Sequence, residues 1–440
     1  MVTIAQLIPT LDEGGAERTT LDVTAAIVAN GWRAVVITQG GRLVPAVERL
    51  GGTVITVPVA SKNPFVVRQN AARLAALKTR EKIDLFHARS RAPAWSALWA
   101  SRRTGCPFVT TFHGAYGARG ALKRRYNSVM VRADTVIANS HFTAAAIVSG
   151  YGDLVPDLAR RMVVIPRGVD LASFSPGAVT AERHKALAGR WHHAGRSSAP
   201  DTTPFVILMP ARPSAWKGHE TALKALARMK AVMNLASRPT AALSNDAIAK
   251  TQAGHGPTFR LIFAGGSDGS AALSGDRAHA SGLVSKHAEF EAALKRLAND
   301  IGVADLVHFS GHEADMPAAY AAADAVIMPS TRPEAFGRVA VEAGAMGVPV
   351  VASDHGGARE TVRHGETGFL VPPGDSDALA DALAALSAMT APARQAMGDA
   401  ARTHVTRHYS SAAMTSATLA VYAAALSGNP SSAANSHAGA

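Results

Sequence analysis

The sequence is poor in cysteine, in aromatic residues and in long apolar runs. Its 440 residues include one cysteine, Cys106, so a disulfide framework is excluded and a reducing compartment is favoured. No stretch approaches the roughly 20 apolar residues that a membrane-spanning helix needs. Aromatic residues make up 5% of the chain and do not interleave with the basic ones, which disfavours a nucleic-acid-binding protein. The 48% of hydrophobic residues is typical of a soluble globular protein, and the length predicts two or three domains.

Acidic residues are scarce in the first part of the chain. The net charge is +12, and residues 1–175 contribute +11 of it. A one-sided basic domain predicts an anionic partner, which could be a nucleic acid, a membrane surface or an acidic substrate. The first residues, MVTIAQLIPT, lack the basic start of a secretory signal peptide, so we expect them to form a strand.

Short apolar runs rich in β-branched residues alternate with longer amphipathic stretches. Runs without polar alternation predict parallel strands that are covered on both faces, and therefore doubly wound α/β domains. The predicted strands of a first series lie at 2–8, 33–39, 53–59, 84–88, 107–113, 135–140 and 162–168. Those of a second series lie at 205–211, 259–266, 307–311, 324–330, 348–354 and 368–373.

The two series predict two Rossmann-like domains in tandem, 1–172 and 173–404. We expect a C-terminal helix at about 405–426 to pack back on the first domain, and a disordered tail at 427–440. The segment 171–204 is expected to connect the domains, with a short helix around AERHKALAGRW. Two inserts without clear periodicity, 235–258 and 267–286, are predicted to be surface loops. In such a fold a ligand is expected between the halves, at the carboxyl ends of the strands.

The segment STRPEAFGRVAVE carries two glutamates, Glu334 and Glu342, eight positions apart. It follows a predicted strand and opens a predicted helix, so Glu334 is expected in the loop and Glu342 on the second helical turn. Free backbone amides and the helix dipole at such an N-terminus bind anions, and Gly337 allows a ligand close to the backbone. The residues expected at this helix end are Phe336, Gly337, Arg338 and Val339.

Two other segments have features of an anion site. In PARPSAWKGHETALKAL, Arg212 and Lys217 stand between a strand and a helix, and their charges suit a diphosphate. In GGAER, Gly14 and Gly15 follow the first strand and could bring backbone amides to a phosphate. The dinucleotide fingerprint G-x-G-x-x-G is absent from this turn, which disfavours a nicotinamide or flavin enzyme.

The ordered set GGAER, TFHG, VIPRGVD, ARPSAWKG, LIFAGG and PEAFGRVAVEAGAMGVPVVAS resembles the retaining glycosyltransferases of family 4, which have the GT-B fold. The resemblance covers residues 1 to about 390. It implies transfer of a sugar from a nucleotide diphosphate sugar with retention at the anomeric carbon. It implies neither a cofactor nor a metal beyond that co-substrate.

The resemblance assigns a role to each matching residue. Glu342 matches the glutamate that holds the ribose hydroxyls, and Glu334 matches the one near the transferred sugar. Arg212 and Lys217 match the pair that binds the diphosphate and stabilises it as leaving group. The amides of Phe336–Val339 would hold the distal phosphate and the sugar.

The resemblance extends to the first domain. Gly15 matches a glycine-loop residue near the diphosphate, and His113 in TFHG matches a histidine near the donor sugar. Arg167 in VIPRGVD is a departure, because this motif usually carries Asn there.

The segment RGALKRRYNSVMVR, residues 119–132, predicts an acceptor-side surface. Leu122, Tyr126, Val129 and Met130 would share one face of a helix. Basic residues beside that face predict an amphipathic helix on an anionic membrane, although a helix with a solvated basic face fits equally well. These basic residues are Lys123, Arg124, Arg125 and Arg132. The surrounding stretches are similar to family members that build lipopolysaccharide core or surface glycans. We therefore expect a lipid-linked or lipopolysaccharide acceptor, a weak preference for mannose from GDP, and a cytoplasmic enzyme peripheral to the inner face of the membrane.

The sequence also fits two alternative functions. A GT-B nucleotide-sugar 2-epimerase would need no acceptor, and a non-catalytic nucleotide-sugar-binding module would need no chemistry. The D-x-D sequence Asp375-Ser-Asp377 precedes a helical pattern, so we interpret it as a helix cap and not as a metal motif. His192–His193 has no supporting ligand cluster and is interpreted as part of a solvated linker.

Overall fold

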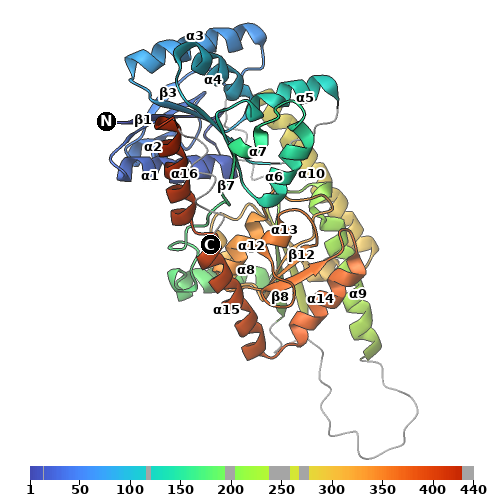
Figure 1. Ribbon diagram of the computed structural model, residues 1–440. Helices are drawn as coiled ribbons and strands as arrows, with labels where there is room; N and C mark the ends of the chain where they lie inside the picture. The colour runs from blue at the N-terminus through green and yellow to red at the C-terminus, as the bar shows by residue number, and fades with distance from the viewer. Residues whose placement is uncertain (13, 115–119, 194–203, 237–257, 267–276, 429–440) are drawn as a thin grey trace, which may run out of the picture. The chain divides into compact units, whose positions relative to one another are not determined.

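The computed structural model describes residues 1–12, 14–114, 120–193, 204–236, 258–266 and 277–428. The chain forms two compact units, Met1–Gly168 with His408–Ala440, and Val169–Arg407 (Figure 1). Residues 429–440 of the predicted tail lie outside the described part. Within that part, no helix is both long and apolar enough to cross a bilayer.

The first unit is built on a seven-stranded parallel sheet in the order β3-β2-β1-β4-β5-β6-β7. Each of the seven predicted strands of the first series is confirmed. The chain reverses its direction of travel between β1 and β4, which is the topological switch point of this sheet. The strands are β1 Thr3–Leu7, β2 Arg33–Thr38, β3 Thr53–Thr56, β4 Leu85–Ala88, β5 Phe108–Phe112, β6 Thr135–Ala138 and β7 Met162–Val164.

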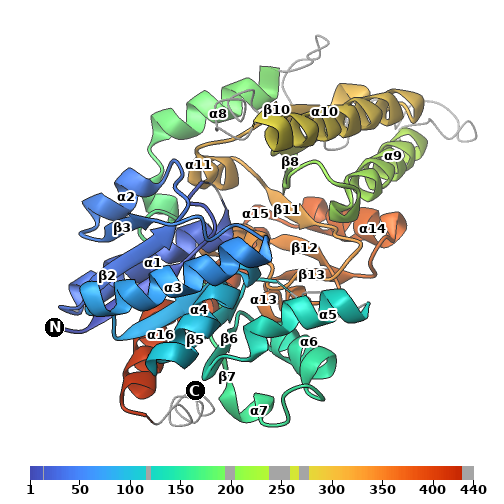
Figure 2. The same cartoon turned by 90° about the horizontal axis from the view of Figure 1, so that it is seen from above.

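Helices cover both faces of this sheet (Figure 2). Residues that alternate along the strands face opposite sides: Ala5 and Leu7 pack in one core with α3 and α4, and Ile4 packs in another with α1 and α16. The helices are α1 Gly15–Ala29, α2 Val44–Arg49, α3 Pro64–Arg80, α4 Arg91–Thr104, α5 Ala121–Asn127, α6 His141–Tyr151, α7 Leu158–Arg161 and α16 Ser411–Leu426.

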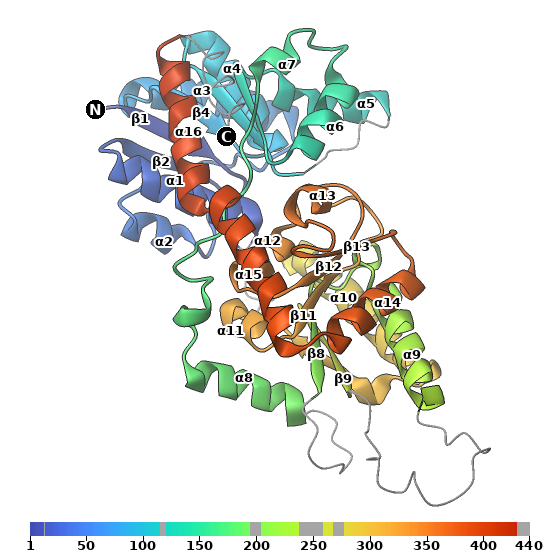
Figure 3. The same cartoon turned by 60° about the horizontal axis from the view of Figure 1, so that its bottom comes forward.

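The C-terminal helix α16 packs against α1 and the sheet of the first unit (Figure 3). Met414 and Val421 contribute to the apolar contact. A buried polar contact accompanies it, because the Tyr422 hydroxyl lies 2.5 Å from His87 Nδ1 while His87 Nε2 lies 2.7 Å from Thr111 Oγ1. The end of the chain therefore completes the core of the unit in which the chain begins.

The second unit is built on a six-stranded parallel sheet in the order β10-β9-β8-β11-β12-β13, with its switch point between β8 and β11. All six predicted strands of the second series are confirmed. The strands are β8 Phe205–Pro210, β9 Phe259–Ala264, β10 Val307–Gly311, β11 Ala325–Met328, β12 Val350–Ser353 and β13 Gly368–Val371. The helices are α8 Ala181–His193, α9 His219–Ala236, α10 Arg277–Asp300, α11 Met316–Ala321, α12 Arg338–Ala345, α13 Ala358–Thr361, α14 Ser376–Ala388 and α15 Ala391–His408.

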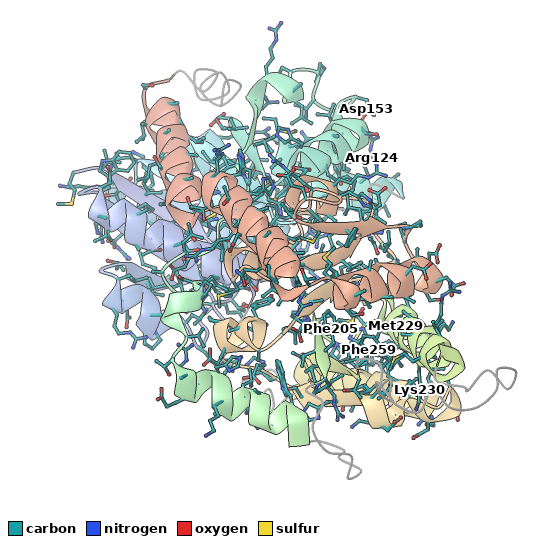
Figure 4. All side chains as sticks on the ribbon, turned by 90° about the horizontal axis from the view of Figure 1, so that it is seen from below. Arg124, Asp153, Phe205, Met229, Lys230 and Phe259 are labelled. Atoms are coloured by element: carbon teal, nitrogen blue, oxygen red, sulfur yellow. The ribbon has the colours of Figure 1, made fainter. Side chains whose placement is uncertain are left out.

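Two apolar cores lie on the two faces of this second sheet. Helices α9, α10 and α14 cover one face, where Phe205 and Phe259 meet edge to face beside Met229 (Figure 4). Helices α8, α11 and α12 cover the other face, where Trp191 and Tyr320 are fully buried. The helix predicted around AERHKALAGRW is confirmed as α8.

The prediction of a loop over 267–286 is wrong for its last ten residues. Helix α10 already begins at Arg277 and runs to Asp300. The segment 277–286 is rich in small and polar residues and shows no clear helical period. It continues directly into an amphipathic stretch, and the helix that this stretch forms extends back to Arg277. Residues 237–257 and 267–276 of the two predicted inserts lie outside the described residues.

His219 gives the second unit an acid-sensitive core. Its ring packs against those of Phe263 and Phe290, and burial lowers the pKa of His219 to about 4. The unfolded chain, with an ordinary histidine pKa of about 6.5, takes up the proton first. The stabilisation that comes from keeping His219 neutral is therefore fully present above pH 6.5. Below that pH the free energy of unfolding falls by about 1.4 kcal/mol per pH unit until the pH reaches about 4.

We expect His219→Leu to reduce this acid sensitivity. The urea concentration at the unfolding midpoint is measured at pH 7.5 and at pH 5 for both proteins. It should decrease less between the two pH values in the variant than in the wild type. His184→Leu, at an exposed position of α8, serves as control and should keep the wild-type shift. Equal acid shifts in all three proteins would contradict the assignment to His219.

Candidate functional site

The switch point of the second sheet carries most of the residues singled out from sequence. The loop after β8 holds Arg212 and Lys217, and the loop after its neighbour β11 holds Glu334. Loops that leave adjacent strands in opposite directions open a crevice at the carboxyl edge of a parallel sheet. Glu334 lies in the loop as predicted, and Glu342 lies on the second turn of α12.

Lys217 and Glu334 form an ion pair although 117 residues separate them in sequence. Lys217 Nζ lies 2.7 Å from Glu334 Oε1, and the Ser330 hydroxyl donates to the same oxygen at 2.7 Å. The Lys217 ammonium also lies 4.2 Å from the centre of the Trp216 ring. A cation with one carboxylate partner keeps other donor directions for an anionic ligand.

Gly218 brings these two loops together. It has φ of 83°, and a Cβ atom there would lie 1.9 Å from the carbonyl oxygen of Pro329. Only glycine fits such an approach in this backbone conformation. The close contact explains how Lys217 reaches Glu334. Arg212 is exposed on the same loop, and its backbone lies against Gly265 at the end of β9.

The segment that leads into α12 packs against the loop after β12. Gly337 is the N-cap residue, Phe336 is buried, and Arg338 begins the helix. The amide of Gly357 donates to the Glu334 carbonyl at 2.8 Å. A Cβ atom on Gly356 would lie 2.5 Å from that carbonyl oxygen, so the two loops are in direct contact. The first amides of an α-helix have no acceptor within the helix, so this N-terminus can bind an anion.

Glu342 is a buried carboxylate with two protein partners. It is 7% exposed, its Oε2 accepts the Tyr320 hydroxyl at 2.9 Å, and its Oε1 accepts Arg338 Nε at 2.5 Å. Burial, and then the nearby Glu342 charge, raise the pKa of Tyr320 well above its ordinary value, so this phenol stays a donor. Each carboxylate oxygen keeps a further lone pair for a ligand hydroxyl. Sequence reasoning missed Tyr320, since no local pattern marks a contact across 22 residues.

The first unit carries the remaining predicted residues at its own carboxyl edge. Gly14 is the N-cap of α1 after β1, and Gly15 is its first residue. His113 follows β5, and its Nδ1 lies 2.8 Å from a guanidinium nitrogen of Arg167. Burial and Arg167 hold the pKa of His113 well below its usual range. The departure from the family pattern at Arg167 therefore contacts a predicted site residue directly.

The prediction of one amphipathic helix over 119–132 is wrong. Helix α5 ends at Asn127, and a tighter 3₁₀ turn over Ser128–Val131 carries Val129 and Met130 into the core. The same apolar periodicity is expected of a helix on a membrane and of a helix that faces a protein core. In this structure the second half of the segment faces the core. Leu122 remains 87% exposed, and Lys123 and Arg125 are exposed beside it.

Two of the four basic residues in this segment have partners within the protein. Arg124 pairs with Asp153 at the start of the loop after α6, and the two side chains lie side by side in Figure 4. Arg132 Nε donates to Ser128 Oγ at 3.3 Å.

The D-x-D and His-His sequences are interpreted as structural and not as metal sites. Asp375 caps α14, because its carboxylate accepts the amides of Asp377 and Ala378, so the capping prediction is confirmed. The side chains of His192 and His193 lie outside the described part. Among the described residues, no three His, Cys, Asp or Glu side chains gather as a metal-ligand group would.

Comparisons with known proteins place this architecture. The family described as Glycosyl transferases group 1 matches residues 194–404, and Glycosyltransferase Family 4 matches residues 13–173. A D-inositol 3-phosphate glycosyltransferase of Salinispora arenicola is 30% identical over 353 residues, which are 77% of this chain and 67% of that protein. The chain belongs to glycosyltransferase family 4. It is a glycosyltransferase with the GT-B fold, as the sequence resemblance implied.

Two further relatives of this family 4 enzyme refine the comparison. The crystal structure of a glycosyltransferase from Rickettsia africae is 30% identical, with a TM-score of 0.79, and the match covers 97% of this chain and 98% of that one. A GDP-mannose-dependent alpha-(1-6)-phosphatidylinositol monomannoside mannosyltransferase of Mycobacterium tuberculosis is 44% identical over 124 residues, which are 26% of this chain and 32% of that protein. Because these relatives are named as glycosyltransferases, a non-catalytic binding module and an epimerase are not favoured.

Proposed function

We propose that this family 4 enzyme transfers mannose from GDP-mannose, with retention, to a lipid-linked acceptor, either a phospholipid-anchored glycan or a lipopolysaccharide core. The observation that carries the proposal is the Lys217–Glu334 ion pair at the switch point of the second sheet. Its Glu334 lies in the loop that leads into the N-terminus of α12. A cation, a carboxylate and a helix N-terminus suit the diphosphate and the sugar of such a donor. The mycobacterial relative, whose name states GDP-mannose, supports the choice of sugar and base.

The residues divide the work of the reaction. As the bond between the anomeric carbon and the phosphate oxygen breaks, the diphosphate takes the electron pair, and Arg212, Lys217 and the α12 amides stabilise its charge. The Glu334 carboxylate favours the positive charge that develops on the sugar ring. The acceptor oxygen bonds to the anomeric carbon on the same face, and its proton passes to a phosphate oxygen. Glu342 holds the ribose throughout.

The donor and the stereochemistry can be tested together. The full chain is incubated with GDP-mannose, GDP-glucose, UDP-glucose or UDP-galactose and a bacterial lipid extract, with and without EDTA. Of the four donors, we expect only GDP-mannose to give an acceptor-dependent product, and NMR should show an α linkage in it. We expect EDTA to leave its yield unchanged. An epimerised nucleotide sugar without acceptor, a β linkage, or preferred use of a UDP sugar would contradict the proposal.

We further propose that α5 brings the enzyme to the inner face of an anionic membrane. Support comes from the exposed Leu122 and its exposed neighbours Lys123 and Arg125, in a part of the chain that carries nearly all the excess positive charge. Each basic residue near an anionic surface contributes about 1 kcal/mol. Arg124 and Arg132 contribute less because the protein already engages them.

Replacing Leu122, Lys123 and Arg125 together by serine should weaken binding to vesicles with phosphatidylglycerol at least about tenfold. Co-sedimentation measures the affinity, and vesicles of phosphatidylcholine alone should bind neither protein. Arg102→Ser with Arg103→Ser removes two exposed arginines from the last turn of α4 and is the matched control. An equal loss in the control would show that general charge, and not α5, mediates binding.

A further inference from the structure

Arg167 and His113 form a contact whose direction is fixed by chemistry. Arg167 follows β7, and His113 follows β5, two strands away in the same sheet. One guanidinium nitrogen of Arg167 lies 2.8 Å from His113 Nδ1 and 3.3 Å from the His113 carbonyl oxygen. This single side chain therefore contacts both the ring and the backbone of His113, the histidine of the TFHG motif.

A guanidinium donates hydrogen bonds and does not accept them. The Nδ1 atom of His113 must therefore be the acceptor, with its lone pair directed at Arg167. A neutral imidazole with an unprotonated Nδ1 carries its proton on Nε2. The contact thus selects one of the two neutral tautomers and opposes the imidazolium form, in which both ring nitrogens would carry protons.

The surroundings of His113 act in the same direction. The titratable and charged groups that influence it are Arg167 from the segment after β7 and Arg89 and His87 from β4 and its end. Together with burial, which is the largest cause, all of them lower the pKa of His113. His113 Nε2 is buried and has no hydrogen-bond partner among the described residues. The nitrogen that carries the proton is thus the one left for a ligand.

We propose that Arg167 is a positioning residue that holds His113 as a neutral hydrogen-bond donor, so that Nε2–H binds an oxygen of the sugar substrate and His113 transfers no proton. The proposal deepens the glycosyl transfer proposed above and rests on it for the identity of the ligand. It explains why an arginine can occupy a position where the family pattern usually carries Asn. The side chain acts on the reaction through His113.

The tautomer can be measured on the free protein, so this test does not depend on turnover. Full-length protein labelled with ¹⁵N-histidine is examined by long-range ¹H–¹⁵N correlation between pH 5.5 and pH 8, and His113→Asn identifies the signal. We expect His113 in the wild type to show the Nε2–H tautomer at every pH. In Arg167→Met, which cannot donate, we expect a mixture of both neutral tautomers, because burial still opposes the imidazolium form.

Arg167→Lys should restore the wild-type tautomer because its ammonium donates. Arg161→Met removes another arginine from the same region, one that donates to the Ala133 carbonyl, and should leave His113 unchanged. With substrates, kcat/KM at pH 7 should fall about tenfold in Arg167→Met and recover in Arg167→Lys. A wild-type His113 that carries its proton on Nδ1 or titrates near pH 6.5 would overturn the proposal, even if Arg167→Met does not fold. Absence of glycosyl transfer with the expected tautomer would instead contradict only the proposed function.

Discussion

Replacing Arg212 and Lys217 together by alanine is expected to lower kcat/KM for the nucleotide sugar by about 10³-fold or more. Each substitution removes positive charge from the place where the proposed leaving group gains negative charge. Loss of one such stabilising donor typically lowers kcat by about 10²- to 10³-fold. The double variant also leaves the Glu334 carboxylate, now without the Lys217 ammonium as its partner, where the sugar and diphosphate are proposed to bind. Release of the nucleoside diphosphate, coupled to a detection enzyme, measures turnover.

The matched control for this variant is Lys230→Ala. Lys230 lies on α9, the helix that follows the Lys217 loop, and pairs with Asp305 on the surface. This substitution removes one lysine and one ion pair from the same unit and leaves the residues at the switch point unchanged. We therefore expect kcat/KM to stay within about twofold of the wild type. Preserved turnover in the double variant would rule out the leaving-group role, provided that thermal unfolding shows both variants to be folded.

Replacing Glu342 by alanine is expected to weaken binding of the free nucleoside diphosphate by about 10- to 100-fold. Hydrogen bonds to a charged group contribute about 1.5–3 kcal/mol, and the ribose offers two hydroxyls to the carboxylate. Isothermal titration calorimetry gives the dissociation constant without requiring an acceptor. Since the buried Tyr320 and the exposed Arg338 would each lose a partner, Glu342→Gln, which keeps the volume, is measured alongside.

Tyr320→Phe provides a graded version of the same experiment. It keeps the Glu342 charge and removes one neutral donor, so the affinity should fall by about fivefold, between the wild type and Glu342→Ala. Glu366→Ala, at an exposed glutamate paired with Arg363, is the control and should bind normally. Nucleotide affinity that is unchanged in Glu342→Ala and Glu342→Gln would contradict the ribose assignment.

The parts of the fold that sequence predicts are those that depend on local composition. Short apolar runs mark the strands of both sheets, because a strand covered on both faces needs no polar residues along its length. The segment 119–132 shows the limit of this reasoning. Its apolar period is the same whether Val129 and Met130 face a membrane or the protein core, and only the turn after Asn127 decides it.

The site is predictable by residue and not by contact. Glu334, Glu342 and Lys217 stand out in sequence through their spacing and their place after strands. Their partners depend on which strands become neighbours, and this order is set by the whole sheet. The Lys217–Glu334 pair spans 117 residues, and the contact of Arg167 with His113 spans 54. Arg167 was visible in sequence only as a departure from a pattern, and its role required the fold.

The return of α16 to the first unit makes that unit discontinuous in sequence. A fragment that ended at Gly168 would lack the helix that covers Ile4, Leu85 and Val109 on one face of the sheet, and would leave His87 without the Tyr422 hydroxyl. Recombinant dissection of this enzyme into halves at the single boundary near residue 168 would therefore yield an incomplete N-terminal half. A circular permutant that joins residues 408–428 directly ahead of residue 1 would keep all its parts on one continuous chain.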